Sequence, residues 1–337
     1  MIFFSGDQKQ PKKARLSGGL AYVLALVTFL TISLRVMPTS AQVLGEPIQP
    51  LPTTIELDQR KVALGDRLFH DPRLSADQSL SCASCHDLDR GGAIPGQQYA
   101  LPGVNGEVVR LNVPTVFNSG LNFLQTWNGR AASLEEQMDG PVLSHAEMGS
   151  NWRDIERILG ADPELRLAFE QIYGRPPVKQ TIKDAIATFE RSLITPNAPF
   201  DLYLQGESEA LSVDARRGYE LFKGYGCVAC HQGMNIGGNM LQVFGIIGNY
   251  FEDRGEISEH DLGLYNVTGR ELDRYVFKVP SLRNVAETAP YFHDGSAADL
   301  KTAIHVMARY QLGRELDDEE VSAIEAFLES LTGAYEG

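Results

Sequence analysis

The sequence has no cysteine left over for a disulfide framework. Its four cysteines all lie in two copies of a C-x-x-C-H motif, within the stretches SLSCASCHDLDRGG and YGCVACHQG. The residues of the two motifs are Cys82, Cys85, His86, Cys227, Cys230 and His231. Because disulfide scaffolds need cysteines spread along the chain, these four indicate a different chemistry.

Basic residues are also scarce. The 337-residue chain has 30 lysines and arginines against 44 aspartates and glutamates, a net charge of −14. An acidic surface repels a phosphate backbone, so we expect no nucleic-acid partner. Such a surface would attract a basic protein partner, although acidity that only keeps the protein soluble explains the charge equally well.

Strand patterns are missing as well. No long alternation of apolar and polar residues occurs, whereas apolar residues recur at helical spacing in several segments. Ile182, Ile186 and Phe189 form such a stripe in residues 181–194, and residues 317–333 carry a second one. The sequence therefore predicts a mainly α-helical fold.

No apolar run reaches the length of a typical membrane span. The longest, LAYVLALVTFLTISL, has about 15 residues, whereas a spanning helix needs about 20. Basic residues precede it and small residues follow it, as in a signal peptide. We interpret residues 1–41 as a signal peptide, with an uncleaved N-terminal anchor as the alternative, and expect a periplasmic protein. Without this segment, 25 basic and 43 acidic residues remain.

The C-x-x-C-H motif carries the three groups that covalent haem attachment needs. Two thiols add to the two vinyl groups of haem, and the adjacent histidine ligates the iron from the same turn. A zinc ribbon would bring its two cysteine pairs within about 20 residues of each other. A thioredoxin-like site would need no histidine after the second cysteine. We therefore expect two covalently bound haem c groups.

The chain after the signal segment divides into two similar halves. Proline-rich residues 42–54 have no periodicity and are typical of a linker. The stretch LITPNAPFD, residues 193–201, connects a domain at 55–197 to a domain at 198–337. Each domain contains one haem motif, a loop-rich insertion and further helices. This organisation predicts two cytochrome c-like haem domains related by duplication.

Together with both motifs, two segments resemble the bacterial di-haem cytochrome c peroxidases and their MauG-like relatives. They are TWNGRAASLEEQMDGPVLSHAEMG, residues 126–149, and KVPSLRNVAETAPYFHDG, residues 278–295. The resemblance runs in a consistent order from about residue 55 to residue 333. It implies a peroxidatic haem domain at 55–197 and an electron-transfer haem domain at 198–337.

The resemblance assigns the distal ligand of the second haem. In the peroxidases this ligand is a methionine, matched here by Met307 in AIHVMARYQLG, whereas MauG-like enzymes have a tyrosine. Without the resemblance, Met234 and Met240 would be rivals, and a methionine in an apolar helix is more often a packing residue. A His231/Met307 pair would give a haem of raised potential that relays electrons.

The loop after the first motif lacks the distal histidine that many of these peroxidases carry. Residues 91–115 contain no histidine, and Val104 falls near its expected place. We infer that His86 is the only protein ligand of the first haem, which would be open to peroxide without prior reduction. By sequence, His145 is the one other candidate for a distal ligand.

Three further residues match catalytic positions of the family. The resemblance places Glu147 and Gln137 above the open iron, where a carboxylate can accept and return a proton and a carboxamide can orient peroxide. From the residues alone, a solvated acid at a helix start is the preferred interpretation of Glu147, and the capped helix at 133–136 is enough to explain Gln137. Trp127 matches a tryptophan between the two haems, or is a core aromatic; Trp152 we interpret as a packing residue.

The resemblance also implies a calcium ion between the domains. The family uses an asparagine side chain and two backbone carbonyls, matched here by Asn112, Thr288 and Pro290. Oxygen ligands of this kind suit a hard cation, with water completing its shell. No acidic calcium-binding loop occurs in the sequence, so the residues alone would not predict this ion.

These assignments favour an exported di-haem c-type peroxidase. It would reduce hydrogen peroxide to water with electrons from a small electron-transfer protein, a cytochrome c or a cupredoxin. The alternative is a MauG-like enzyme that uses peroxide to oxidise side chains of a protein substrate. Met307 favours the peroxidase, whereas the missing distal histidine favours the MauG-like enzyme or a peroxidase without an activation step. A plain electron carrier, the third hypothesis, would need no open site. The resemblance allows a homodimer.

Overall fold

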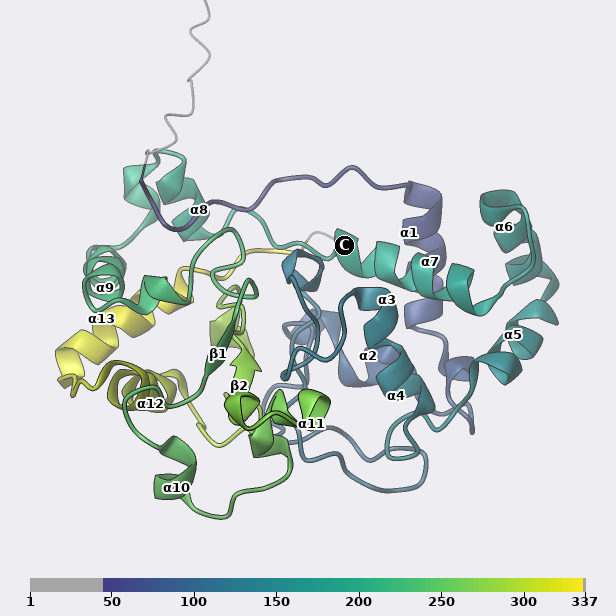
Figure 1. Ribbon diagram of the computed structural model, residues 1–337. Helices are drawn as coiled ribbons and strands as arrows, with labels where there is room; N and C mark the ends of the chain where they lie inside the picture. The colour runs from purple at the N-terminus through teal and green to yellow at the C-terminus, as the bar shows by residue number, and fades with distance from the viewer. Residues whose placement is uncertain (1–44, 336–337) are drawn as a thin grey trace, which may run out of the picture. The chain divides into compact units, whose positions relative to one another are not determined.

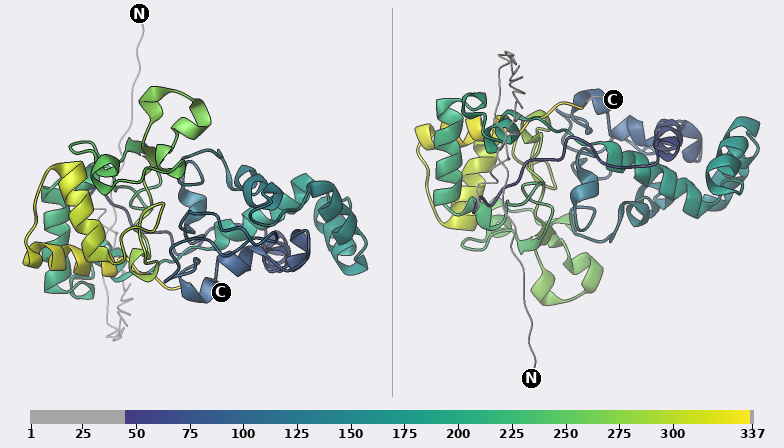
Figure 2. Two further views of the ribbon diagram at one scale, coloured as in Figure 1. Left: turned by 90° about the horizontal axis from the view of Figure 1, so that it is seen from below. Right: turned by 90° about the horizontal axis from the view of Figure 1, so that it is seen from above.

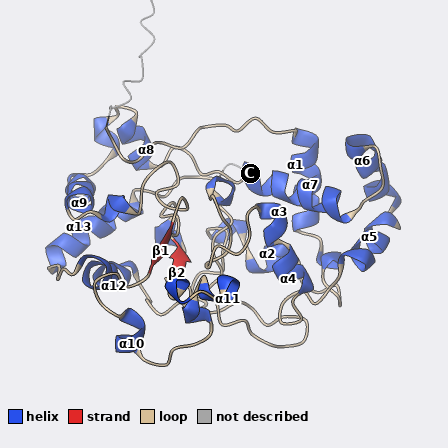
Figure 3. Ribbon diagram, in the orientation of Figure 1, coloured by secondary structure: helices blue, strands red, loops and turns tan. Residues whose placement is uncertain are grey.

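The computed structural model describes residues 45–335 (Figure 1), so the expected signal peptide lies outside the described part of the chain. Helices and long loops make up this part, together with one short two-stranded sheet (Figure 3). The predicted mainly helical fold is confirmed. None of the helices within these residues is long and apolar enough to cross a membrane.

The first half consists of helices and loops, and one of its helices carries the first haem motif. The helices are α1 (Gln59–Phe69), α2 (Cys82–Cys85), α3 (Leu134–Gln137), α4 (Asp139–Leu143), α5 (Trp152–Gly160), α6 (Pro163–Tyr173) and α7 (Lys179–Ser192). The stripe expected in residues 181–194 thus lies in α7, where Ile182, Ile186 and Phe189 are buried. Trp152 is also buried, as expected for a packing residue.

The second half adds six helices and both strands. They are α8 (Pro199–Leu204), α9 (Val213–Gly224), α10 (Tyr250–Arg254), α11 (Tyr265–Thr268), α12 (Leu300–Leu312), α13 (Asp318–Glu329), β1 (Leu241–Val243) and β2 (Val276–Lys278). The strands are antiparallel, with Leu241 opposite Lys278. The second predicted stripe lies in α13, which Asp317 caps through the Glu320 N–H group.

Each half is built on a packed pair of long helices. α1 packs against α7, and α9 packs against α13. The two pairs lie well apart, and α5 and α6 lie beyond α1 and α7 on the side away from α9 and α13 (Figures 1 and 2). A Cβ atom on Gly65 would lie 2.0 Å from the Ala185 carbonyl oxygen, and one on Gly218 would lie 1.9 Å from that of Ala323. Only glycine permits this backbone approach. Its use at both crossings supports the predicted duplication.

A second repeated feature lies in the loops between the haem motifs and the later helices. An asparagine with left-handed backbone conformation, at φ 59° in one half and 55° in the other, precedes an antiparallel bridge across a tight turn. The corresponding residues are Asn118 and Asn284, Gln125 and Tyr291, and Ala131 and Ala297. Members of each pair are 166 positions apart. The two halves therefore align residue by residue in this region.

The residues from 45 to 335 belong to one compact unit. A core in the first half includes Phe69 and Phe169, and a core in the second half includes Phe200 and Phe327. A third cluster combines Phe244, Tyr250, Phe251 and Phe277. Because the residues on both sides of position 197 belong to this one unit, the domain boundary expected near residue 197 remains a prediction.

Candidate active site

The first haem motif folds into the single turn of α2. The His86 N–H group donates to the Cys82 carbonyl at 2.9 Å, so the histidine caps the C-terminal end of the helix that carries both cysteines. Its Nδ1 lies 3.2 Å from the Gly92 carbonyl oxygen and must carry the proton, because a carbonyl only accepts. The lone pair of Nε2 is then free to ligate a metal. Burial lowers the pKa of His86, so the imidazole is neutral.

The second motif repeats this geometry. The His231 N–H group donates to the Cys227 carbonyl at 2.9 Å, and its Nδ1 lies 3.3 Å from the Ile236 carbonyl oxygen. Burial lowers the pKa of His231 to about 4. A phenylalanine ring lies beside each histidine. The ring centroids of Phe69 and His86 are 6.5 Å apart, and those of Phe222 and His231 are 6.3 Å apart. Both motifs therefore present a neutral imidazole in an apolar setting.

The cysteines fit haem attachment better than metal binding. All four are free of disulfides. Burial raises the pKa of Cys82 to about 12 and that of Cys227 to about 11, because a negative thiolate would lose its hydration at either position. A thioether to a vinyl group carries no charge and suits such a buried position. The residues present therefore fit two haem c groups.

Met307 lies in surroundings suited to a distal ligand. Its side chain is partly buried in α12 and packs against the third apolar cluster. By contrast, the side chain of Met234 is 40% exposed. Met240 directly precedes β1, and its backbone carbonyl accepts from the Val279 N–H group at 3.0 Å. Packing favours Met307 over the exposed Met234, whereas Met240 is half-buried like Met307, so ligation of the iron by Met307 remains a prediction.

The first half has no counterpart of Met307. At the 166-residue offset, the position of Met307 corresponds to Pro141 in α4, and proline has no side-chain donor atom. Val104 lies against the loop of the candidate acid, because its N–H group donates to the Glu147 carbonyl at 2.9 Å. The side chain of His145 is exposed. That His86 alone ligates the first haem remains a prediction.

Glu147 lies in the loop between α4 and α5, near the first motif. Burial raises the pKa of its carboxyl, against the opposing effects of the Ser144 hydroxyl and the Arg130 charge. Its charge in turn raises the pKa of the Cys85 thiol, although burial is the larger cause there. Gln137 ends α3 and is half-buried. A partly desolvated carboxyl of this kind can exchange protons near neutral pH more readily than an exposed one.

Trp127 connects the two halves. Its Nε1 donates to the Asn112 carbonyl at 2.8 Å, and its carbonyl accepts from the Lys278 N–H group at 2.8 Å. The indole packs against the third apolar cluster, as Met307 does. The structure thus places this first-half residue beside the second-haem region, where a residue that relays electrons would be needed.

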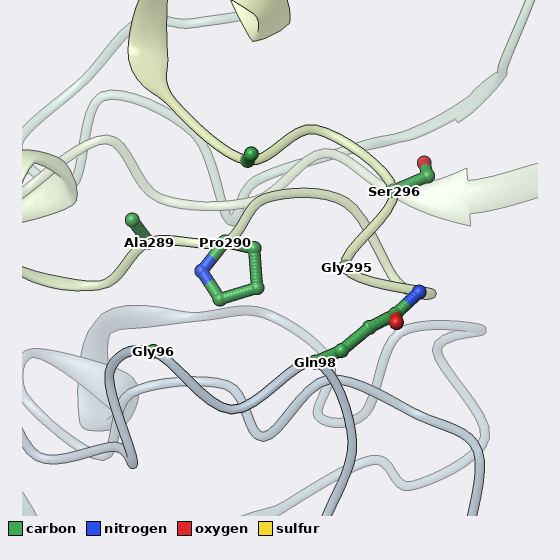
Figure 4. A pocket seen from close by; sticks show the side chains of 7 residues that line it. Gly96, Gln98, Ala289, Pro290, Gly295 and Ser296 are labelled. Carbon is green, nitrogen blue, oxygen red and sulfur yellow. The ribbon is translucent and has the colours of Figure 1, made fainter.

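Two of the three residues expected to bind calcium meet in the structure. Asn112 is buried, and the Nδ2 of its side-chain amide donates a hydrogen bond to the Pro290 carbonyl at 2.5 Å, so the amide nitrogen rather than its oxygen faces this carbonyl. Thr288 lies two residues before this carbonyl. A cavity of about 390 Å³ opens beside it (Figure 4), lined by Gly96, Gln98, Ala289, Pro290, Gly295, Ser296 and Ala298. The amide and carbonyl oxygens are of the kind that calcium prefers.

Several buried charged residues were not identified from the sequence, and one of them, Lys278, lies near the second haem motif. Lys278 occupies the position that corresponds to Asn112 at the 166-residue offset, within the matching tetrapeptides N-V-P-T and K-V-P-S. Its side chain is 8% exposed. Alignment of the two halves would have drawn attention to it, because a lysine stands where the other half has a neutral amide.

Two haem-attachment motifs in a duplicated helical fold define a di-haem c-type cytochrome. Two protein-family models match the chain and agree with this class. The family described as "Di-haem cytochrome c peroxidase" matches residues 59–209, and the family described as "Cytochrome c" matches residues 215–332. The cytochrome c551 peroxidase of Nitrosomonas europaea is 43% identical over 310 residues, which cover 91% of each chain. The chain therefore belongs to the di-haem cytochrome c peroxidase family, which has MauG relatives.

Two further likenesses agree with this assignment. The cytochrome c peroxidase Ccp of Escherichia coli is 47% identical over 292 residues, which cover 86% of this chain and 62% of that longer protein. A crystal structure of a MauG-like protein associated with microbial copper homeostasis superposes with a TM-score of 0.74 at 29% identity, covering 85% of this chain and 93% of the other. The predicted family, the fold class and the functional class of cytochrome c peroxidase, an oxidoreductase, are confirmed.

Proposed function

We propose that the first half reduces hydrogen peroxide to water with electrons that enter through the second half. The reaction converts one peroxide, two protons and two electrons into two waters. When bound, the haems supply the iron at which the O–O bond breaks and the second redox centre that relays electrons. The unequal distal sides support this division of labour, because Met307 in one half corresponds to Pro141 in the other.

Glu147 is the proposed acid–base residue. Cleavage of the O–O bond needs a proton to move from one peroxide oxygen to the other, so that the second oxygen leaves as water. The Glu147 carboxylate accepts the first proton and returns it to the leaving oxygen. Its burial supports this role, because the raised pKa of the carboxyl brings it closer to the working pH. The Gln137 amide orients peroxide by donating a hydrogen bond.

Trp127 is the proposed connection for electrons between the halves. Its backbone and side chain bond to Lys278 in one half and Asn112 in the other, and its ring lies beside the cluster that contacts Met307. Both hydrogen bonds hold the indole in one orientation. Asn112, Thr288 and Pro290 are the proposed calcium ligands, whose role would be to tie the Asn112 loop to the loop of Pro290.

The proposed donor is a small cytochrome c or cupredoxin in the periplasm. Ile246 and Ile247 are 48% and 64% exposed, and the Ile247 N–H group donates to the Tyr310 carbonyl of α12 at 2.9 Å. This apolar surface therefore lies next to the helix of Met307. A partner with a basic rim would match the acidic chain. A homodimer is proposed only from the resemblance.

The alternative is a MauG-like oxidation of a protein substrate, favoured by the absence of histidine from residues 91–115. A peroxide assay of the fully oxidised and the half-reduced protein, with a reduced small cytochrome c as donor, separates the two functions. Equal turnover by both forms supports a peroxidase that needs no activation. Absence of turnover with every donor tested would overturn the peroxidase proposal and favour the alternative.

A further inference from the structure

Lys278 is a buried cation without an anionic partner among residues 45–335. Its side chain is 8% exposed, and burial alone lowers the pKa of the ammonium to about 8, with no carboxylate opposing that effect. Lys183 shows the usual arrangement. It is similarly buried, at 7% exposure, but its Nζ lies 2.9 Å from an Asp139 carboxylate oxygen. Buried charges are normally paired in this way, because an isolated charge loses its hydration without compensation.

The surroundings of Lys278 belong to the second haem motif. Lys278 lies opposite Leu241 in the sheet, and the next residue of that strand, Gln242, contacts the Cys230 thiol. Two positions after Lys278, the Pro280 carbonyl contacts the imidazole of His231. The lysine is therefore held by the same strand and loop that approach both a thioether cysteine and the proximal histidine.

Each haem c carries two propionate carboxylates, which are the anions that the folded holoprotein adds to this region. We propose that the Lys278 ammonium binds a haem propionate, that of the second haem being favoured by the contacts with Cys230 and His231. Such a pairing would tie the cofactor to the strand residue that also contacts Trp127, whose carbonyl accepts from the Lys278 N–H group at 2.8 Å. It also keeps a positive charge close to the iron, which favours the reduced state and raises the reduction potential.

The first half supports this assignment by contrast. Asn112, the residue that corresponds to Lys278, is neutral, and its amide contacts the Pro290 carbonyl. The duplication has therefore placed a cation only at the position next to the second motif. An electrostatic difference of this kind would make the second haem the better electron acceptor, in keeping with entry of electrons there.

The test is a spectroelectrochemical titration of the full-length holoprotein without peroxide. Lys278→Gln should lower the reduction potential of the haem that carries the methionine-ligated signal. Lys278→Arg keeps the positive charge, so the potential of that haem should stay close to the native value. Lys183→Gln is the matched control, because it removes a buried ammonium that already has a carboxylate partner; neither haem potential should change. A fall confined to the first haem would keep the lysine–propionate pair but overturn its assignment to the second haem.

Unchanged potentials of both haems in Lys278→Gln, with both haems attached, would overturn the proposal. If Lys278→Gln does not mature, resonance Raman spectra of Lys278→Arg provide the second readout. The propionate bending mode of one haem should shift relative to that of the native protein, and an unshifted mode would refute the contact. The inference rests on haem attachment and not on peroxide turnover, so failure of the peroxidase assay would leave it standing.

Discussion

Replacement of Glu147 by glutamine tests the centre of the proposed mechanism. Glutamine has the same shape but accepts no proton at neutral pH. Two hydrogen bonds of Glu147 use its backbone and do not depend on the carboxyl: its N–H group donates to the Ser144 carbonyl at 3.0 Å, and its carbonyl accepts from the Val104 N–H group at 2.9 Å. The substitution should therefore leave the fold and both haem sites intact.

The expected loss follows from the role and burial of the carboxyl. General acid–base catalysis contributes about 10² to 10⁴-fold to a rate. Glu147 is only half-buried, so water can take over part of the proton transfer in the variant. We therefore expect the lower end of the range, roughly a 100-fold loss in kcat, which corresponds to about 2.7 kcal/mol of barrier.

The pH profile provides a second readout of the same change. Only the ionised carboxylate can accept the proton, and burial raises the pKa of Glu147 above its usual value. Turnover should consequently rise with pH through this raised pKa, and Glu147→Gln should lose that rising limb. A structural role alone would not remove it.

Steady-state peroxide assays with a reduced cytochrome c would measure both effects. Glu136→Gln is the control, because it removes an exposed carboxylate of α3; its turnover should match that of the native protein. The reasoning is refuted if Glu147→Gln retains turnover within a factor of three of the native protein, or if its haem spectra change.

Three other substitutions address the second haem and the stability of the fold. Met307→Ala should remove the methionine-ligated low-spin spectrum and leave the other haem high-spin; survival of that spectrum would make Met234 or Met240 the ligand. Glu190 is 6% exposed, and burial raises the pKa of its carboxyl from 4.5 to about 8. The folded state therefore holds this proton more tightly than the unfolded state does. Its contribution to stability is fully present below pH 4.5 and is lost as the pH rises to about 8. The unfolding free energy should therefore fall by up to about 5 kcal/mol over that range in urea titrations, and Glu190→Gln should flatten the decline; an unchanged slope would contradict the assignment. Asp201 and Arg283 form an ion pair at 2.7 Å with side chains 0% exposed, so Asp201→Asn should cost about 3 to 5 kcal/mol in the same assay. The exposed pair formed by Asp58 and Arg60 provides the comparison, and equal effects of Asp58→Asn and Asp201→Asn would refute the role of burial.

Local chemistry made much of this protein predictable. The thiols and the imidazole of each haem motif lie within five consecutive residues, so no knowledge of the tertiary fold is needed to group them. The apolar stripe of α7 identified a helix for the same reason, because residues three and four apart share a face. The domain duplication was also visible, although its 166-residue offset emerged only from the repeated turns and bridges.

The sequence by itself determined where haem attaches and that the fold is helical, because those properties depend on neighbouring residues. Tertiary structure decided what surrounds each haem motif. Asn112 meets Pro290 across 178 positions, and the Trp127 carbonyl meets Lys278 from the other half of the chain. It also decided that Lys278 is buried without a carboxylate beside it. Burial and charge pairing depend on segments that meet only after folding, so no local pattern could reveal them.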